Sequence, residues 1–290
     1  MSTEGRNSKT MNLDKMSISE FLRVMNEEDK LVPQAISEVL DDIEDIIQAV
    51  VLTFNQGGRL IYFGAGTSGR LAVLDAVECV PTFSTSPEMV TALIAGGEKA
   101  FIRSVEGAED SEELAEKDLE NIELSAFDMV IGIAASGRTP YVIGGLNYAN
   151  EVGAKTAAIS CNKHSKISKL VDWFVEVDLG PEVLTGSTRL KAGSAQKMIL
   201  NMISTASMIS IGKTYGNLMV DVKPSNEKLV DRAKRIIVEA TGVAYEIAEK
   251  YYDLSLGRPK LAIVMIIRNC SLEEAERKLE SGFVSKAIED

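Results

Sequence analysis

The sequence predicts an α/β protein built on a doubly wound parallel sheet, with a second, smaller helical region. Short apolar runs alternate with segments that have the apolar spacing of helices, which is typical of a parallel sheet covered on both faces. Two of the runs, Leu60–Phe63 and Met129–Ala135, lead directly into loops rich in glycine and hydroxyl side chains. With 290 residues, 45% of them hydrophobic, the chain is long enough for one large domain and a small module.

Residues 1–57 are expected to form an N-terminal helical segment that packs on the sheet domain. The first 16 residues are polar and are expected to be loosely held unless a partner chain covers them. Ser17–Asp29 has apolar residues at helical spacing after a serine N-cap, with Glu20 at the capping-box position. One long helix is predicted from about Val32 to Asn55, and its apolar stripe fits packing on the sheet and contact with a second copy equally well.

Residues 58–224 are expected to form the sheet domain, and residues 225–290 a small helical module. Ligands of doubly wound folds bind outside the carboxyl ends of the strands, so the glycine-rich loops are expected together at that edge. In chain order the predicted elements are a strand at 60–63, a helix at about 70–78, a strand at 89–95, an acidic helix at about 111–121, a strand at 129–135, a helix at 140–152, strands at 155–160 and 173–177, a helix at about 192–211, and helices at 227–240, 244–253, 261–269, 272–279 and up to 288.

The first glycine-rich loop, in the stretch RLIYFGAGTSGR at 59–70, is predicted to hold a phosphate at the start of a helix. Gly64, Gly66 and Gly69 permit close backbone approach, while Thr67 and Ser68 add hydroxyl donors. The stretch also matches the GxGxxG pattern of dinucleotide-binding turns, which requires an acidic residue at the end of the next strand, roughly 20 residues on. The next apolar run ends in two glycines instead, so dinucleotide binding is rejected.

A second loop repeats the tripeptide SGR at 136–138, directly after the run Met129–Ala135. Two hydroxyl-rich loops that each follow a strand favour a sugar phosphate held between them, with tight turns that bind no ligand as the alternative. A third polar loop, at 180–197, contains two cations, Arg189 and Lys191. They are the natural partners for a substrate anion, and a capping or surface pair is the alternative.

The composition excludes several classes of partner and mechanism. The 43 acidic residues exceed the 31 basic ones and give a net charge of −12, which repels nucleic acid and anionic membranes, so an anionic substrate must be captured locally by helix N-termini and a few cations. The single histidine, His164, is expected to be an ordinary loop residue, which argues against a Ser-His-Asp triad or a multi-histidine metal site. Three distant cysteines indicate reduced thiols. Without a membrane-spanning run or a secretory signal, the protein is expected in the cytoplasm.

Two glutamates are the candidates for acid–base chemistry, which without histidine falls to carboxylates, lysine or tyrosine. Most other acids lie in charge-rich stretches such as 106–120. Glu78 lies in DAVECVP, where apolar neighbours would raise its pKa and favour proton sharing. Glu109 lies in a glycine-broken loop before the acidic helix, where an acid is more often a helix cap.

Several segments resemble the N-acetylmuramic acid 6-phosphate etherases, a family of the sugar isomerase (SIS) superfamily. The resemblance runs from about Thr3 to the C-terminus, with no departure in the catalytic motifs. The block GPEVLTGSTRLKAG is specific to the etherases and their glucokinase-regulator relatives. The segments that carry the resemblance are GAGTSGR, DAVECVPTF, AGGEKAF, VEGAEDS, IAASGRTPY, GPEVLTGSTRLKAGSAQK and NLMVDV.

The resemblance implies a flavodoxin-like, three-layer SIS domain in a lyase of amino-sugar catabolism and cell-wall recycling. Such an enzyme cleaves the D-lactyl ether of N-acetylmuramic acid 6-phosphate, needs no metal or redox cofactor, and works as a homodimer whose second chain partly completes the site. The family's two catalytic acids fall on Glu78 and Glu109. The residues implied in substrate binding are Ser136, Gly137, Arg138 and Thr139 for the phosphate, Thr67 and Ser68 for the sugar, and Ser187, Thr188, Arg189 and Lys191, which would close the site.

Three other functions fit parts of the pattern. A sugar-phosphate isomerase or an aldolase-like enzyme could share the fold and would interconvert a ketose and an aldose without releasing lactate. A non-catalytic sensor like the glucokinase regulator belongs to a different class, and that relative has two such domains in a much longer chain. A DNA-binding regulator would need a basic helix-turn-helix, which the acidic N-terminus does not offer.

Overall fold

The computed structural model describes residues 1–103, 105–222 and 226–289, and the chain divides into two compact units. The first unit comprises residues 1–76 and 88–204, and the second comprises residues 77–87 and 205–290. Two helices, α4 (Gly66–Phe83) and α8 (Lys191–Ser210), contribute residues to both. The boundary expected at 224/225 lies outside the described residues.

The first unit contains a five-stranded, all-parallel sheet with the strand order β2-β1-β3-β4-β5, which confirms the predicted fold class. The order reverses between β1 and β3, and doubly wound sheets bind their ligands at such a switch point. In register, Gly64 at the end of β1 lies opposite both Ile94 and Ile133, so three neighbouring strands end at the same level. The strands are β1 (Leu60–Gly64), β2 (Val90–Ile94), β3 (Met129–Ile133), β4 (Lys155–Ser160) and β5 (Trp173–Glu176).

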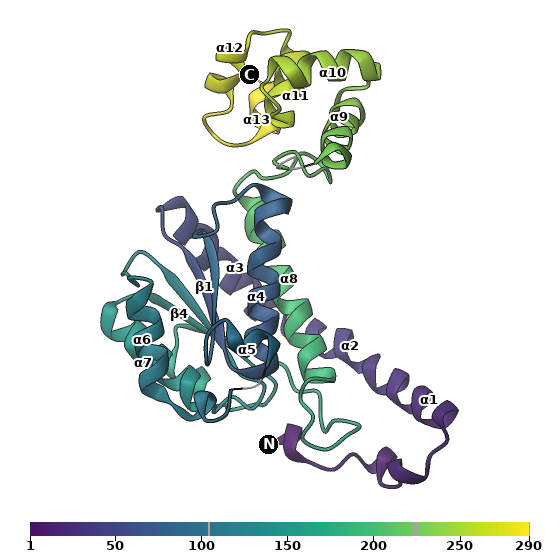
Figure 1. Ribbon diagram of the computed structural model, residues 1–290, viewed down its shortest axis with the longest axis vertical. Helices are drawn as coiled ribbons and strands as arrows, with labels where there is room; N and C mark the ends of the chain where they lie inside the picture. Colours follow the sequence, from purple (N-terminus) through teal and green to yellow (C-terminus); the bar gives the residue numbers. More distant parts are fainter. Residues whose placement is uncertain (104, 223–225, 290) are drawn as a thin grey trace. The chain divides into compact units, whose positions relative to one another are not determined.

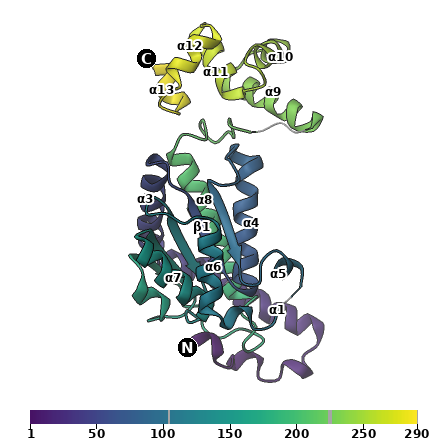
Figure 2. The same ribbon diagram turned by 60° about the vertical axis from the view of Figure 1, so that its left-hand side comes forward.

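Helices cover both faces of this sheet. Helix α3 (Leu40–Asn55) and the first-unit parts of α4 and α8 lie on one face, while α6 (Glu112–Asn121) and α7 (Pro140–Val152) lie on the other (Figures 1 and 2). The central strands β1 and β3 are buried along their whole length between these layers, while β2 and β5 at the edges are only partly buried. The near-continuous apolar runs in the sequence follow from this double covering.

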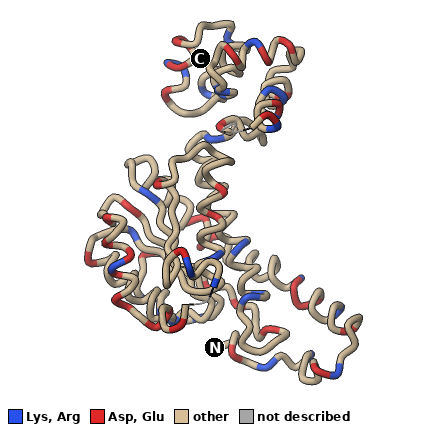
Figure 3. Tube along the Cα trace, viewed as in Figure 1, with Lys and Arg blue, Asp and Glu red and all other residues tan. Residues whose placement is uncertain are grey.

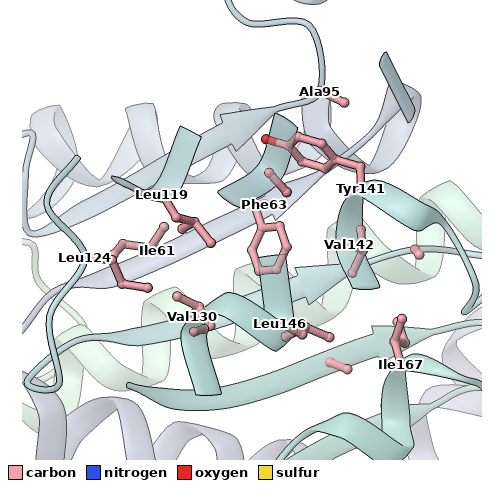
Figure 4. Close-up of a cluster of buried hydrophobic side chains, with 14 of the residues drawn as sticks. Ile61, Phe63, Ala95, Leu119, Leu124, Val130, Tyr141, Val142, Leu146 and Ile167 are labelled. Carbon is pink, nitrogen blue, oxygen red and sulfur yellow. The ribbon is translucent and has the colours of Figure 1, made fainter. Parts of the chain in front are cut away.

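The core under α7 is built around Phe63, which points from β1 toward Tyr141, Val142 and Leu146 (Figure 4). The rings of Phe63 and Tyr141 meet edge to face with centroids 6.3 Å apart. Gly145 of α7 leaves room for the Phe63 ring, because a Cβ added there would lie only 2.4 Å from it. The buried Tyr141 hydroxyl donates a hydrogen bond to Asp118 at 2.7 Å.

The N-terminal helices are only partly as predicted. Helix α1 (Ile18–Asp29) has the predicted capping box between Ser17 and Glu20. The single helix predicted over 32–55 is wrong, because the chain forms α2 (Leu31–Ser37) and α3 with a break at Val39, whose φ of −128° is not helical. The break buries Val39 and leaves Leu40 exposed. Apolar spacing continues across it, so periodicity alone did not reveal it.

Helix α4 begins at Gly66 and not near Arg70, so Thr67 and Ser68 lie in its first turn. Gly66 has a φ of +54°, in the left-handed region that favours glycine. A Cβ on Gly69 would lie 2.6 Å from the carbonyl oxygen of Gly64, so the first turn of α4 packs directly on the end of β1. A short helix that was not predicted, α5 (Lys99–Ile102), follows β2.

The expectation that residues 1–16 are loosely held is wrong for three polar residues there. Thr3, Asn7 and Thr10 are buried, and each has a hydrogen-bonded side chain. The Thr10 hydroxyl donates to the carbonyl oxygen of Val183 at 2.8 Å. Polar side chains are readily buried when they are hydrogen-bonded in this way, and composition alone does not show such partners.

The second unit carries the helical tail, as predicted. Its core contains apolar residues from several helices, among them Ile237, Ala262 and Val264. Searched over the described residues, no helix combines the length and the apolar character that a membrane crossing needs. The tail helices are α9 (Glu227–Thr241), α10 (Tyr245–Leu254), α11 (Pro259–Arg268), α12 (Leu272–Lys278) and α13 (Val284–Glu289).

Replacing Gly145 with alanine should lower the free energy of unfolding by about 1–3 kcal/mol, because the new methyl group overlaps the buried Phe63 ring. Urea denaturation measures this change. Gly193→Ala in α8 is the matched control, since a Cβ there meets its nearest atom at an ordinary 3.5 Å. Equal stability of the Gly145→Ala and Gly193→Ala variants would contradict this account of the core.

Candidate functional site

The predicted loops lie at the carboxyl edge of the sheet. The start of α4, helix α5 and the segment before α8 lie at one end of the first unit, and the N-terminal segment reaches the same end (Figures 1 and 2). We call residues 64–70 the first loop and residues 136–139 the second loop. Residues 191–197 lie in α8, so the third loop is residues 180–190.

The first and third loops meet at the start of α8. A Cβ added to Gly193 would lie 3.5 Å from the Thr67 methyl group and 3.6 Å from the Thr188 carbonyl oxygen. Thr67 and Thr188 therefore flank the same turn of α8. Ser68 is buried, and its hydroxyl donates to the side-chain oxygen of Gln196 on α8 at 3.0 Å.

The second loop is held against the segment that follows β4. Gly137 has a φ of +68°, and a Cβ there would lie 2.3 Å from that of Ser165. Its carbonyl oxygen accepts hydrogen bonds from the backbone of Lys166 and Ile167. The other three residues of the loop remain accessible, with Arg138 exposed and Ser136 and Thr139 half-buried.

Thr139 is the N-cap of α7, but its hydroxyl makes no capping hydrogen bond. The second loop thus presents hydroxyl groups beside the start of a 13-residue helix. Backbone N–H groups and the helix dipole favour anions at such a position.

Glu109, whose side chain is exposed, lines a pocket of about 310 Å³ at the start of α4. It belongs to a short 3-10 turn, Ala108–Asp110, whose Ala108 is buried in the core. Ser111 caps α6, so Glu109 is not the helix cap that the sequence left open. The residues that line the pocket are Ala65, Gly66, Arg70, Ala95, Ala100, Val105, Glu106, Gly107 and Glu109.

Arg70 fixes one wall of this pocket. Its guanidinium donates to the carbonyl oxygens of Phe101 at 3.0 Å and Ala100 at 2.8 Å, which ties α5 to the first turns of α4. A cation and two carboxylates, Glu106 and Glu109, therefore border the same pocket.

Glu78 does not share a unit with Glu109. It belongs to the second-unit part of α4, whereas Glu109 belongs to the first unit. Its side chain is exposed, so the apolar surroundings that the sequence predicted are not observed within one chain.

Lys191 is not the accessible cation that the sequence predicted. Its side chain is 2% exposed, and its ammonium pairs with Glu28 of α1 at 2.6 Å and donates to the Leu179 carbonyl oxygen at 3.0 Å. Arg189, by contrast, is exposed, and Ser187 and Thr188 are half-buried. Of the two predicted cations of the third loop, only Arg189 is accessible to an anion.

Sequence reasoning missed four residues that shape this region. Glu182 is buried, and its carboxylate accepts from the backbone N–H groups of Lys191 and Ala192 at the start of α8. The other three are Glu28, Arg70 and Gln196. The repeated SGR tripeptide was a signal for Arg70, and the family-specific block was one for Glu182. No feature of the sequence indicated Glu28, because it is one of several acidic residues at the end of a predicted helix.

His164 lies in a loop, and the Cys161 thiol donates to the carbonyl oxygen of Ala192 at the start of α8 at 3.8 Å. His164 is exposed, and its backbone N–H donates to Glu176, which confirms its reading as a loop residue. Cys79 and Cys161 are buried and Cys270 is half-buried. Burial raises the pKa of the Cys161 thiol, which keeps it protonated at neutral pH.

Comparison with known proteins gives close relatives over the whole chain. The N-acetylmuramic acid 6-phosphate etherases of Bacillus cereus and Bacillus anthracis are each 62% identical over 290 residues, covering 99% of this chain and 99% of theirs. A family model described as the glucokinase regulatory protein N-terminal SIS domain matches residues 42–150.

Among solved structures, a phosphoheptose isomerase from Francisella tularensis aligns with a TM-score of 0.51 at 14% identity, over 66% of this chain and 98% of that one. The phosphoheptose isomerase of Neisseria gonorrhoeae aligns with a TM-score of 0.50 at 15% identity, over 66% and 98% of the two chains. At these identities the likeness shows the fold alone.

The carboxyl of Glu28 should make the stability of the protein depend on acid pH. Burial alone would raise its pKa, but hydrogen bonds from Lys191, Lys9 and Asn7 outweigh burial and lower the pKa from 4.5 to about 2. Its stabilising contribution is fully present above pH 4.5 and is lost as the pH falls toward 2. In urea denaturation, the difference in free energy of unfolding between the wild type and Glu28→Gln should therefore shrink across this window. A constant difference would contradict the pairing.

Proposed function

Because this chain belongs to the N-acetylmuramic acid 6-phosphate etherase family, we propose that it cleaves the D-lactyl ether of N-acetylmuramic acid 6-phosphate. The products are N-acetylglucosamine 6-phosphate and D-lactate, and the reaction serves amino-sugar catabolism and cell-wall recycling. The observation that carries the proposal is the 62% identity over the full chain. The pocket at the carboxyl edge of the sheet, which brings Glu109 beside the start of α4, supports it.

The chemistry needs only groups that this chain supplies. The alkoxide released from an unactivated ether is a poor leaving group. In the open-chain sugar, however, C1 is an aldehyde, which makes the proton on C2 more acidic. The lactyl oxygen on C3 is β to that carbon, so loss of the proton allows its elimination, and water then adds at C3. The two steps require a base, an acid and a firm hold on the phosphate.

Glu78 is assigned as the acid–base group that acts at C2 and protonates the departing lactyl oxygen. Glu109 assists and activates the water that adds at C3, and its position in the pocket supports this role. Glu78 is exposed in the single chain. We propose a homodimer, in which the second chain partly completes each site and covers this carboxyl. The enzyme is proposed to act in the cytoplasm.

The substrate is proposed to lie between the three loops. Ser136, Gly137, Arg138 and Thr139 hold the phosphate beside the start of α7, and the hydroxyl of Thr139, which makes no capping bond, supports this. Thr67 and Ser68 contact the sugar. Since the Ser68 hydroxyl already donates to Gln196, its oxygen is left to accept a hydrogen bond from the substrate. Ser187, Thr188 and Arg189 close the site, and Arg189 is suited to the lactyl carboxylate.

A sugar-phosphate isomerase and a non-catalytic sugar-phosphate sensor are the alternative functions. Both are compatible with the fold, which is shared with phosphoheptose isomerases. The etherase is favoured because the relatives that match the full chain carry that name.

Incubating the purified protein with N-acetylmuramic acid 6-phosphate in ¹⁸O-labelled water should release D-lactate and place the label on C3 of N-acetylglucosamine 6-phosphate. Elimination followed by water addition puts a solvent oxygen atom on C3, so the label must appear there. Mass spectrometry of the sugar and an enzymatic lactate assay measure the two products. Tight binding without lactate would indicate the sensor, and a new ketose without lactate would indicate the isomerase.

Glu78→Gln and Glu109→Gln should each lower kcat for lactate release by about 100-fold or more, since general acid–base groups typically contribute that much. Glu112→Gln is the matched control, because Glu112 is an exposed acid close to Glu109 in the chain and should leave kcat unchanged. Circular dichroism checks that each variant is folded. Normal turnover in a folded Glu78→Gln variant would remove Glu78 from the mechanism.

A further inference from the structure

A buried ion pair connects α1 to the base of the third loop. We propose that Glu28 and Lys191 are positioning residues, which hold residues 183–190 in place so that Ser187, Thr188 and Arg189 face the substrate. The inference rests on the proposed function for its catalytic consequence. The ordering of the loop itself does not depend on that function.

The geometry makes Lys191 a bridge rather than a substrate contact. Its ammonium lies 2.6 Å from a carboxylate oxygen of Glu28 and 3.0 Å from the carbonyl oxygen of Leu179, and the two charged side chains are 2% and 4% exposed. To reach a substrate, the ammonium would have to leave both partners. Removing one member of a buried pair leaves the other charge buried without compensation, so each residue depends on the other.

A second carboxylate, that of Glu182, joins the two ends of the loop. Glu182 is 1% exposed, and its oxygens accept from the backbone N–H groups of Lys191 at 3.0 Å and Ala192 at 2.9 Å. The chain segments at 179–182 and 191–192 are thus fastened together, which leaves residues 183–190 as a closed loop. A carboxylate at this position also satisfies unpaired N–H groups at the start of the 20-residue helix α8.

The N-terminal segment reinforces the same contact. The Asn7 amide donates to Glu28 at 2.8 Å and to the carbonyl oxygen of Pro181 at 3.3 Å. Lys9 pairs with the other oxygen of Glu28, but its side chain is 60% exposed. Lys9 is therefore a suitable control, because it touches the same carboxylate and not the loop.

A displacement of this loop would directly change the position of Thr188 in the candidate site. The Thr188 carbonyl oxygen accepts from the N–H of Gly193, and Gly193 packs beside Thr67 of the first loop. A shift in the third loop therefore changes the spacing between Thr188 and Thr67. Misplacement of a binding group by about 1 Å can cost on the order of 100-fold in rate.

The test compares Glu28→Gln, Lys191→Met, Lys191→Arg and Lys9→Met by KM and kcat for lactate release and by the rate of tryptic cleavage after Arg189. Glu28→Gln and Lys191→Met should raise KM on the order of ten-fold or more and should speed cleavage after Arg189. Lys191→Arg keeps the charge and the donors, so it should recover most of both properties. Lys9→Met should change neither by more than about two-fold.

Glu28→Gln separates positioning from direct substrate contact. If Lys191 bound the substrate itself, freeing its ammonium from Glu28 would leave KM unchanged or lower, with cleavage after Arg189 unaltered, and that result would overturn the proposal. The double variant Glu28→Gln/Lys191→Met should raise KM and the cleavage rate no more than the more strongly affected single variant does, because both changes break one contact. If Lys191→Met does not fold, the KM values and cleavage rates of Glu28→Gln and Lys191→Arg test the proposal. If the wild type releases no lactate, the proposed function fails, and the cleavage rates alone decide whether the pair orders the loop.

Discussion

The parallel pairing of β1 with β2 on one side and β3 on the other determines where the candidate site of the first unit lies. Because Gly64 is level with both Ile94 and Ile133, the segments that follow these three strands leave the sheet together. Helix α4 starts directly after β1, and its first turn packs on the end of that strand because Gly69 has no Cβ to collide with the Gly64 carbonyl oxygen. The pocket beside Glu109 is a consequence of this arrangement.

An anionic substrate must be held by a protein of net charge −12, and acidic residues lie on many elements of the chain (Figure 3). Lys191 is paired with Glu28, and the exposed cations of the second and third loops are Arg138 and Arg189. Under the proposed function, these two cations and the starts of α4 and α7 attract the substrate anion at close range. The more distant acidic surface is screened over about 8 Å, so it does not cancel this attraction.

Local patterns in the sequence predicted the strands and most helices, and even the bounds of α7 and β4. Features that depend on distant partners could not be predicted in this way. Lys191 lies in a polar loop sequence, and nothing in its neighbourhood indicates that Glu28, 163 positions away, would bury it. The exposure of the Glu78 side chain was also not predicted. Its sequence neighbours are apolar, but the face of α4 that carries Glu78 is exposed.

The hydrogen bond from Thr10 to Val183 spans 173 positions of the chain, and this separation sets an order of events during synthesis. Thr10 and its neighbours leave the ribosome before Val183, and they cannot take their final places until the segment around Val183 has emerged. Contacts between such distant residues also close the longest loops and so form late in folding. The third loop is therefore among the last parts of the first unit to be assembled, after the sheet that supports it.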